Sequence, residues 1–209
     1  MRTDDLINSL SRSPQAEVLN PRALSERFGL AVAVPAALFL LAFGVRPDLI
    51  SQMANPLIAV KTLLPLAVMG FAWWAVTRLA RPGRVLRLSW GWTLMVPVVV
   101  TAVFGMLGRP ADLWFAEARP FYLGECIGLI ILLSVVPAII GLRLASRGAS
   151  VRPRLTATFV GLAAGAGAAA GYSLFCTQDN PMFYVPWYGL AICVVTLATV
   201  RWGTRWLLW

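Results

Sequence analysis

The chain has 209 residues, of which 59% are apolar and only 13% are charged, and its formal net charge is +9. So few charged side chains cannot cover a soluble globular domain of this size, and the composition therefore predicts an integral membrane protein. The absence of histidine excludes bis-histidine haem, histidine metal clusters and Ser-His-Asp catalysis. We find no other catalytic constellation and expect neither an enzyme nor a resident cofactor.

The first 27 residues are the longest polar stretch, and we expect them to form a cytoplasmic partner-binding segment (1–27) ahead of a membrane domain (28–209). In this segment Thr3 can cap a short helix whose positive end suits Asp4 and Asp5. An apolar stripe at helical spacing follows, made of Leu6, Ile7 and Leu10. Two turns are not stable alone, so we expect the helix to dock into a groove on a soluble protein. A helix lying on the bilayer is the alternative, which the two acids disfavour.

Six apolar runs follow, and each is long enough to cross a hydrocarbon core of about 30 Å as a helix. They cover residues 28–45, 57–77, 90–108, 122–142, 155–175 and 185–203. Asn20 followed by Pro21 is a helix start signal ahead of the first run. Asp4, Asp5 and Glu17 stand where a signal peptide has a basic region, and no small-residue cleavage site follows this run, so it is not expected to be a signal peptide. The predicted fold is therefore all-α and polytopic, with six transmembrane helices.

The distribution of basic residues predicts the orientation of these helices. With six crossings, 14 of the 18 basic residues fall on the side of both termini, and the other 4 fall on the opposite side. Every acid after residue 27 lies on that opposite side, namely Asp48, Asp112, Glu117, Glu125 and Asp179. The positive-inside rule then places both termini in the cytoplasm. Anionic lipid headgroups, and not nucleic acid, explain the positive charge. Lys61, near the outer end of the second run, is expected to extend its side chain to the interface.

Two of the three cysteines are predicted to lie at the outer surface. Cys126 begins the fourth run and Cys176 ends the fifth, and a cytoplasmic hairpin between these runs would make their outer ends neighbours. The pair could form a disulfide, bind a soft metal ion transiently with help from Glu125 or Asp179, or be oxidised as a sensor. Two apolar filler residues are the alternative, which fits Cys193 inside the sixth run best. No CxxC motif is present, which disfavours a dithiol oxidoreductase.

The fifth run contains the glycine-rich stretch GLAAGAGAAAG at residues 161–171. It lacks the Lys-Ser/Thr that a phosphate-binding loop requires. Gly161 with Gly165, and Gly167 with Gly171, instead form two small-xxx-small pairs, which allow a neighbouring helix backbone to approach closely. We therefore expect tight packing of the fifth helix, either within one chain or in a dimer.

Three segments together resemble the NrsF family of membrane anti-sigma factors: TDDLI near the N-terminus, GECIGL in the fourth run, and CTQDNPMFYVPWYGLAI from residue 176. The resemblance implies a multi-pass protein of the bacterial inner membrane that holds an extracytoplasmic-function sigma factor inactive. The matching N-terminal residues, Thr3 to Ile7, would bind the sigma factor. Cys126 and Cys176 match the family's paired cysteines, which implies a response to heavy-metal or oxidative stress. Phe175 stands where the family often has histidine, which favours a thiol role over a metal-ligand role.

Two other classes of function remain open at this point. A small transporter or channel is the main alternative, but transporters usually carry ionisable residues near the bilayer midplane, which this chain lacks. A redox enzyme that passes electrons to quinone is the other, and the missing CxxC motif disfavours it. Only the anti-sigma hypothesis predicts that deletion of residues 1–13 abolishes function while membrane insertion remains intact.

Overall fold

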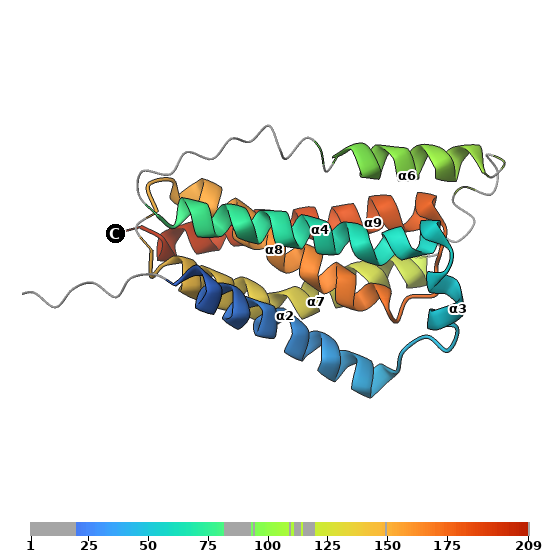
Figure 1. The fold of residues 1–209 in the computed structure, drawn as a ribbon, viewed down its shortest axis with the longest axis horizontal. Coiled ribbons are helices and arrows are strands. Elements are labelled where there is room, and N and C mark those ends of the chain that lie inside the picture. The colour runs from blue at the N-terminus through green and yellow to red at the C-terminus, as the bar shows by residue number, and fades with distance from the viewer. Residues whose placement is uncertain are drawn as a thin grey trace, which may run out of the picture.

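In the computed structural model, the residues described are 20–81, 93, 95–108, 110, 114, 120–148 and 150–208. Their regular structure is helical throughout, which confirms the predicted all-α class (Figure 1). The helices are α2 (Pro21–Phe43), α3 (Leu49–Met53), α4 (Pro56–Leu79), α6 (Met95–Leu107), α7 (Pro120–Ala145), α8 (Pro153–Ser173) and α9 (Pro181–Gly203), with a final 3-10 turn, η2 (Thr204–Trp206). The predicted helix at Thr3 to Leu10 lies outside the described residues.

Five helices are long and apolar enough to span a membrane, namely α2, α4, α7, α8 and α9. The third predicted span corresponds to α6, which has 13 residues and is shorter than the roughly 20 residues that one crossing requires. The described residues therefore provide five membrane-length helices and one shorter apolar helix, where six spans were predicted. The start of α2 and the C-terminal end of the chain lie at the same end of the bundle (Figure 1).

Asparagine–proline pairs begin two of the long helices. The side-chain oxygen of Asn20 accepts a hydrogen bond of 3.0 Å from the backbone N–H of Arg22, and Pro21 occupies the first turn of α2. The start signal read from the sequence is confirmed, and α2 begins seven residues before the apolar run at residue 28. Asn180 caps α9 in the same way through the N–H of Met182, at 3.1 Å, so that α9 begins before its predicted run at residue 185.

The bundle is organised around α8, which contacts α2, α4, α7 and α9. In the most apolar stretch of α8, 78% of the residues are buried, which is the highest share among the five long helices. A Cβ atom on Gly161 would lie 2.7 Å from the Cα of Thr196 in α9, and one on Gly171 would lie 2.8 Å from the Cβ of Ala36 in α2. These glycines thus lie where α8 closely approaches α9 and α2. Because the glycines are used within one chain, they do not support a dimer interface.

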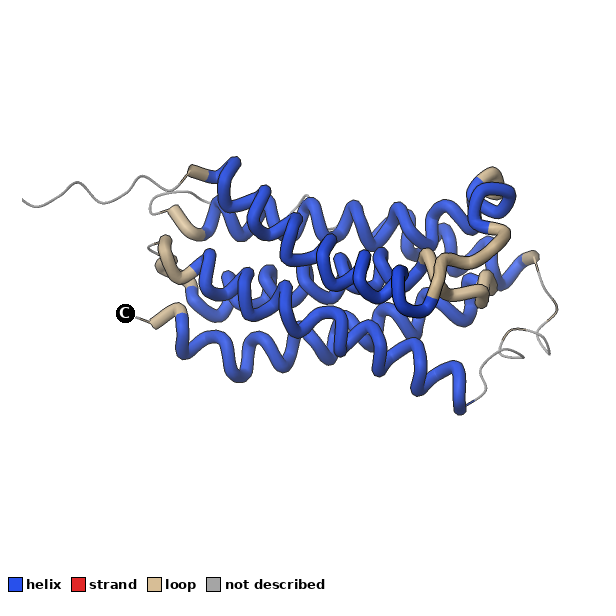
Figure 2. Tube along the Cα trace, turned by 90° about the horizontal axis from the view of Figure 1, so that it is seen from below, coloured by secondary structure: helices blue, strands red, loops and turns tan. Residues whose placement is uncertain are grey.

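Buried side chains form two clusters along the bundle. One includes Phe28 and Trp73, whose rings stack at 3.8 Å between centroids, and it joins α2, α4, α7 and α8 near the end of the bundle where α2 begins. The other joins α7, α8 and α9 towards the opposite end and contains both predicted surface cysteines. Figure 2 shows the helices side by side in a second view. The second cluster contains the candidate site.

Candidate functional site

The structure brings Cys126 and Cys176 into one buried cluster with Tyr172 and Tyr188. Cys126 lies near the start of α7, and Cys176 follows the last turn of α8, so the ends of two antiparallel helices place them at the same level. Both are free thiols. The structure thus places the two cysteines in the same part of the bundle. Cys193 is exposed on α9, away from this cluster.

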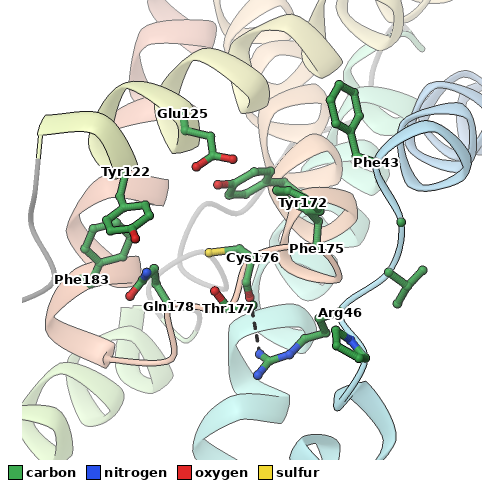
Figure 3. A pocket seen from close by; sticks show the side chains of 13 residues that line it. Phe43, Arg46, Tyr122, Glu125, Tyr172, Phe175, Cys176, Thr177, Gln178 and Phe183 are labelled. Carbon is green, nitrogen blue, oxygen red and sulfur yellow. Dashed lines mark hydrogen bonds between the residues drawn. The ribbon is translucent and has the colours of Figure 1, made fainter.

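A pocket of about 320 Å³ opens beside Cys176 at this end of the bundle. Figure 3 shows the sulfur of Cys176 pointing into the space between Tyr172 and Gln178, while the carboxyl group of Glu125 faces the hydroxyl of Tyr172. Cys126 is fully buried and does not line the pocket. The remaining lining residues are Phe43, Gly44, Val45, Arg46, Pro47, Tyr122, Phe175, Thr177 and Phe183. The two thiols thus differ in access, although they share one cluster.

An arginine in the loop after α2 holds the segment that carries Cys176. The guanidinium of Arg46 donates to both carboxylate oxygens of Asp179, at 2.7 and 2.9 Å, and to both oxygens of Asp48, at 2.8 and 3.0 Å. It also donates to the backbone carbonyl of Cys176 at 3.4 Å (Figure 3). Hydrogen bonds from Arg46 are the main cause that lowers the pKa of Asp48 to about 2. The pKa of Arg46 is raised in turn, first by Asp48 and then by Asp179.

Lys61 of α4 reinforces the same segment from the other side. Its ammonium group donates to the backbone carbonyls of Cys176 and Gln178, at 2.7 and 2.8 Å, and to Asp179 at 3.2 Å. The side chain is only 1% exposed. The expectation that Lys61 reaches the membrane interface is therefore wrong, because the carbonyls at the end of α8 supply the partners that water would otherwise supply.

These contacts explain why polar residues 177–180 interrupt two apolar helices. Asp179 joins the two cations, Asn180 begins α9, and the hydroxyls of Thr62 and Ser173 share a hydrogen bond of 2.7 Å beneath them. We call the group formed by Arg46, Lys61 and Asp179 the outer clamp. Sequence reasoning missed it, although two of the four outer basic residues and one of the five outer acids belong to it. The signal for the outer clamp was that basic residues and acids occur together on the predicted outer side.

The site does not provide a full set of metal ligands. Among the described residues no three His, Cys, Asp or Glu side chains gather closely enough to hold a metal ion. Asp179, one of the two expected helpers, is engaged by Arg46 and Lys61. Glu125 lines the pocket with Cys176 but makes no described hydrogen bond or ion pair. The geometry is therefore that of two thiols beside a pocket, with one carboxyl group opposite.

The difference in access predicts an order of reaction. In a Cys193→Ser background, we expect a small thiol reagent to modify Cys176 well before Cys126, because only Cys176 lines the pocket. Intact-protein mass spectrometry over time measures this order. Cys176→Ser is expected to abolish the fast phase, and Cys126→Ser is expected to preserve it. A fast phase that survives Cys176→Ser would contradict the arrangement.

Two curated relatives align over the whole chain. The anti-sigma-F factor NrsF of Caulobacter vibrioides is 29% identical over 214 residues, which cover 100% of this chain and 99% of the relative. The probable anti-sigma-F factor NrsF of Azospira oryzae is 32% identical over 223 residues, which cover 100% of both chains. No solved structure matches the chain significantly.

The family profile described as negative regulator of sigma F matches residues 11–209, which include the outer clamp and both thiols of the site. The profile does not reach Thr3 to Leu10. Negative regulation of a sigma factor is a regulatory role, which agrees with the expectation that the protein is not an enzyme. The chain belongs to the NrsF family, as the resemblance of its cysteine-bearing segments predicted.

Proposed function

We propose that the protein is a membrane-bound anti-sigma factor that binds a sigma factor of the sigma F type and releases it when the outer thiols are modified. Its membership of the NrsF family carries the first half of this proposal. The names of both relatives describe anti-sigma-F factors. The second half rests on the outer clamp, because the carbonyl of Cys176 is held by cations from two other parts of the bundle.

The cytoplasmic segment 1–27 would bind the sigma factor through Thr3, Asp4, Asp5 and the apolar stripe that continues to Leu10. A short helix that is unstable alone gains its stability from the groove it enters. The arginines near the end of the bundle where α2 begins support a cytoplasmic position for that end. The thiol pocket would then face the periplasm of a bacterial inner membrane, where disulfides can persist.

The outer clamp offers a physical connection between thiol and helix positions. Lys61 is the sixth residue of α4, and α4 packs along α8 towards the end of the bundle where α2 begins. A modification that moves the backbone of Cys176 must stretch its bond to Lys61 or shift α4 with it. Peroxide, for example, would oxidise the two thiols to a disulfide and be reduced to two molecules of water. Soft metal ions would bind to the two sulfurs.

The required energy sets a lower limit on the signal. Moving the sigma factor from 1% to 99% free requires a shift of about 5.5 kcal/mol between the bound and released states. A single surface hydrogen bond contributes about 1 kcal/mol and is insufficient. A covalent disulfide or a metal ion held by two thiolates has the necessary scale.

Co-purification from the native host tests the proposal. Tagged wild-type protein is expected to retain a sigma factor, and deletion of residues 1–13 is expected to lose it while the protein remains in the membrane. The triple variant Leu6→Ala/Ile7→Ala/Leu10→Ala should behave like the deletion, because it removes the apolar stripe. Its matched control, Asn8→Ala/Ser9→Ala, changes other faces of the same helix and should retain the sigma factor.

Treatment with cadmium or peroxide tests the sensing half separately. Wild type is expected to release the sigma factor, and Cys126→Ser/Cys176→Ser is expected to hold it under both conditions. Release from the double variant would refute thiol sensing but leave the anti-sigma role intact. If no sigma factor is recovered from untreated wild type, the anti-sigma role itself fails, and substrate flux in proteoliposomes would then test the transporter alternative.

A further inference from the structure

The lining of the outer pocket is rich in aromatic rings. Five of its 13 lining residues are aromatic, namely Phe43, Tyr122, Tyr172, Phe175 and Phe183. The rings of Tyr172 and Phe175 lie 6.0 Å apart between centroids, and those of Phe43 and Phe175 lie 6.3 Å apart. Aromatic faces attract cations as well as apolar groups. The lining therefore suits a ligand that is both apolar and positively charged.

The arginine in the pocket cannot serve an anionic ligand. A guanidinium has five N–H donors, and those of Arg46 make five hydrogen bonds, two to Asp48, two to Asp179 and one to the carbonyl of Cys176. The side chain of Arg46 is 3% exposed. A phosphate or carboxylate would have to displace one of these acids. The positive charge of Arg46 is therefore fully used within the protein.

The same holds for the neighbouring lysine. The three N–H donors of Lys61 make three hydrogen bonds, to the carbonyls of Cys176 and Gln178 and to Asp179. The two cations and the two acids that they contact have a formal net charge of zero. Apart from Arg46, the thiol and two tyrosines, Glu125 is the one ionisable residue in the pocket lining, and no described residue makes a hydrogen bond or ion pair with it. Among the described residues, this carboxyl group thus has no ion-pair partner.

We propose that the outer pocket binds a small organic cation, an ammonium group with alkyl or aromatic substituents, between Glu125 and the aromatic rings. The carboxylate supplies the opposite charge, and Tyr122, Tyr172 and Phe175 supply ring faces and apolar contact. The volume of about 320 Å³ lies at the lower end of the range for small-molecule sites. The sulfur of Cys176 points into the same space, so an occupant would shield this thiol from reagents (Figure 3).

Two sources could supply this chemistry, a free cation or the headgroup of a zwitterionic lipid. Dodecyl maltoside has no ammonium group, so protein in micelles of this detergent is the starting sample. Nanodiscs of phosphatidylglycerol and of phosphatidylcholine then separate the sources, because only the phosphatidylcholine headgroup would compete with a free ligand. The measurement needs no sigma factor, so its failure would leave the anti-sigma role untouched.

Saturation-transfer NMR with benzyltrimethylammonium as the probe tests the site. We expect saturable binding that choline displaces and that 3,3-dimethylbutan-1-ol, which has the shape of choline without its charge, does not displace. Glu125→Gln is expected to weaken binding by at least about tenfold. Glu26→Gln makes the same change at the exposed start of α2 and should leave binding unchanged. Absence of saturable binding at millimolar probe, or equal binding by Glu125→Gln, would overturn the proposal.

A neighbouring pair of aromatic residues provides a second matched comparison. Tyr122 lines the pocket, whereas the adjacent Phe121 is 75% exposed and does not line it. Tyr122→Leu is expected to weaken probe binding, and Phe121→Leu is expected to have no effect. Equal effects of the two substitutions would show that the aromatic lining is not involved and would count against the site.

Thiol chemistry provides a test that keeps Glu125 in place. In Cys126→Ser/Cys193→Ser protein, we expect the trimethylammonium-ethyl methanethiosulfonate cation to modify Cys176 faster, relative to the sulfonatoethyl anion, than it modifies a free small thiol. Benzyltrimethylammonium should slow the modification. A rate ratio equal to that of the free thiol, with no protection by the probe, would overturn the proposal even if Glu125→Gln does not fold.

Discussion

Asp179→Asn is expected to lower the free energy of unfolding by about 3 kcal/mol. Asp179 accepts hydrogen bonds from both Arg46 and Lys61, whose side chains are 3% and 1% exposed. An amide can accept one of these bonds but carries no charge, so it leaves two buried cations with a single acid between them. The uncompensated charge is costly because neither side chain can reach water without disrupting the end of α8.

Unfolding in mixed dodecyl maltoside and dodecyl sulfate micelles, followed by tryptophan fluorescence, measures this loss. The matched control is Asp48→Asn, which removes a second carboxylate bound to the same arginine. Its effect should be smaller, because the side chain of Asp48 is 44% exposed and contacts no lysine. Equal stability of Asp179→Asn and wild type would show that the outer clamp does not hold the bundle together.

Gly161→Ala is the second substitution with a large expected effect, a loss of about 2 kcal/mol in the free energy of unfolding. The new methyl group would lie 2.7 Å from the backbone of Thr196 and 2.9 Å from the Cβ of Thr199. These distances are too short for carbon atoms, and so α8 and α9 must separate. Separation reduces packing along the whole contact between two helices, where close approach of small residues provides most of the attraction.

Gly70→Ala is the matched control for this substitution. Gly70 lies within α4, and a Cβ atom there would have no neighbour within 4 Å. Alanine favours a helix over glycine, so this variant should be as stable as wild type or slightly more stable. The same unfolding titration compares the two variants. If they unfold together, the close contact between α8 and α9 is incorrect.

The predicted features of the fold depend on local or periodic signals. Apolar runs predicted the five membrane-length helices, together with a sixth that is the shorter α6 in the structure, and Asn20–Pro21 predicted the start of the first. The same Asn-Pro signal stands at Asn180–Pro181, but the start of this helix was predicted at residue 185, where the apolar run resumes. Helix ends were therefore predicted least well, since polar caps extend helices beyond their apolar stretches.

Contacts between distant residues were harder to predict. The arrangement of antiparallel helices was sufficient to place Cys126 and Cys176 near each other. The bonds from Lys61 to Cys176 and Asp179 span more than 110 residues, and no periodic pattern relates their positions. Lysine near a helix end usually reaches water, but here the carbonyls of Cys176 and Gln178 bind it instead. Such a pairing requires knowledge of which helices are neighbours.

The enclosure of α8 has a consequence for the synthesis of the protein. The most apolar stretch of α8 is less apolar than that of any other long helix, because alanine and glycine replace the large side chains that lipid-facing helices carry. Insertion of a segment into the bilayer depends on its own apolarity. The fifth run is therefore expected to leave the translocon stably only when α2, α4 and α7 are already in place. A ribosome that stalls before α9 would leave Gly161 and Gly165 of α8 uncovered, a state suited to recognition by membrane proteases.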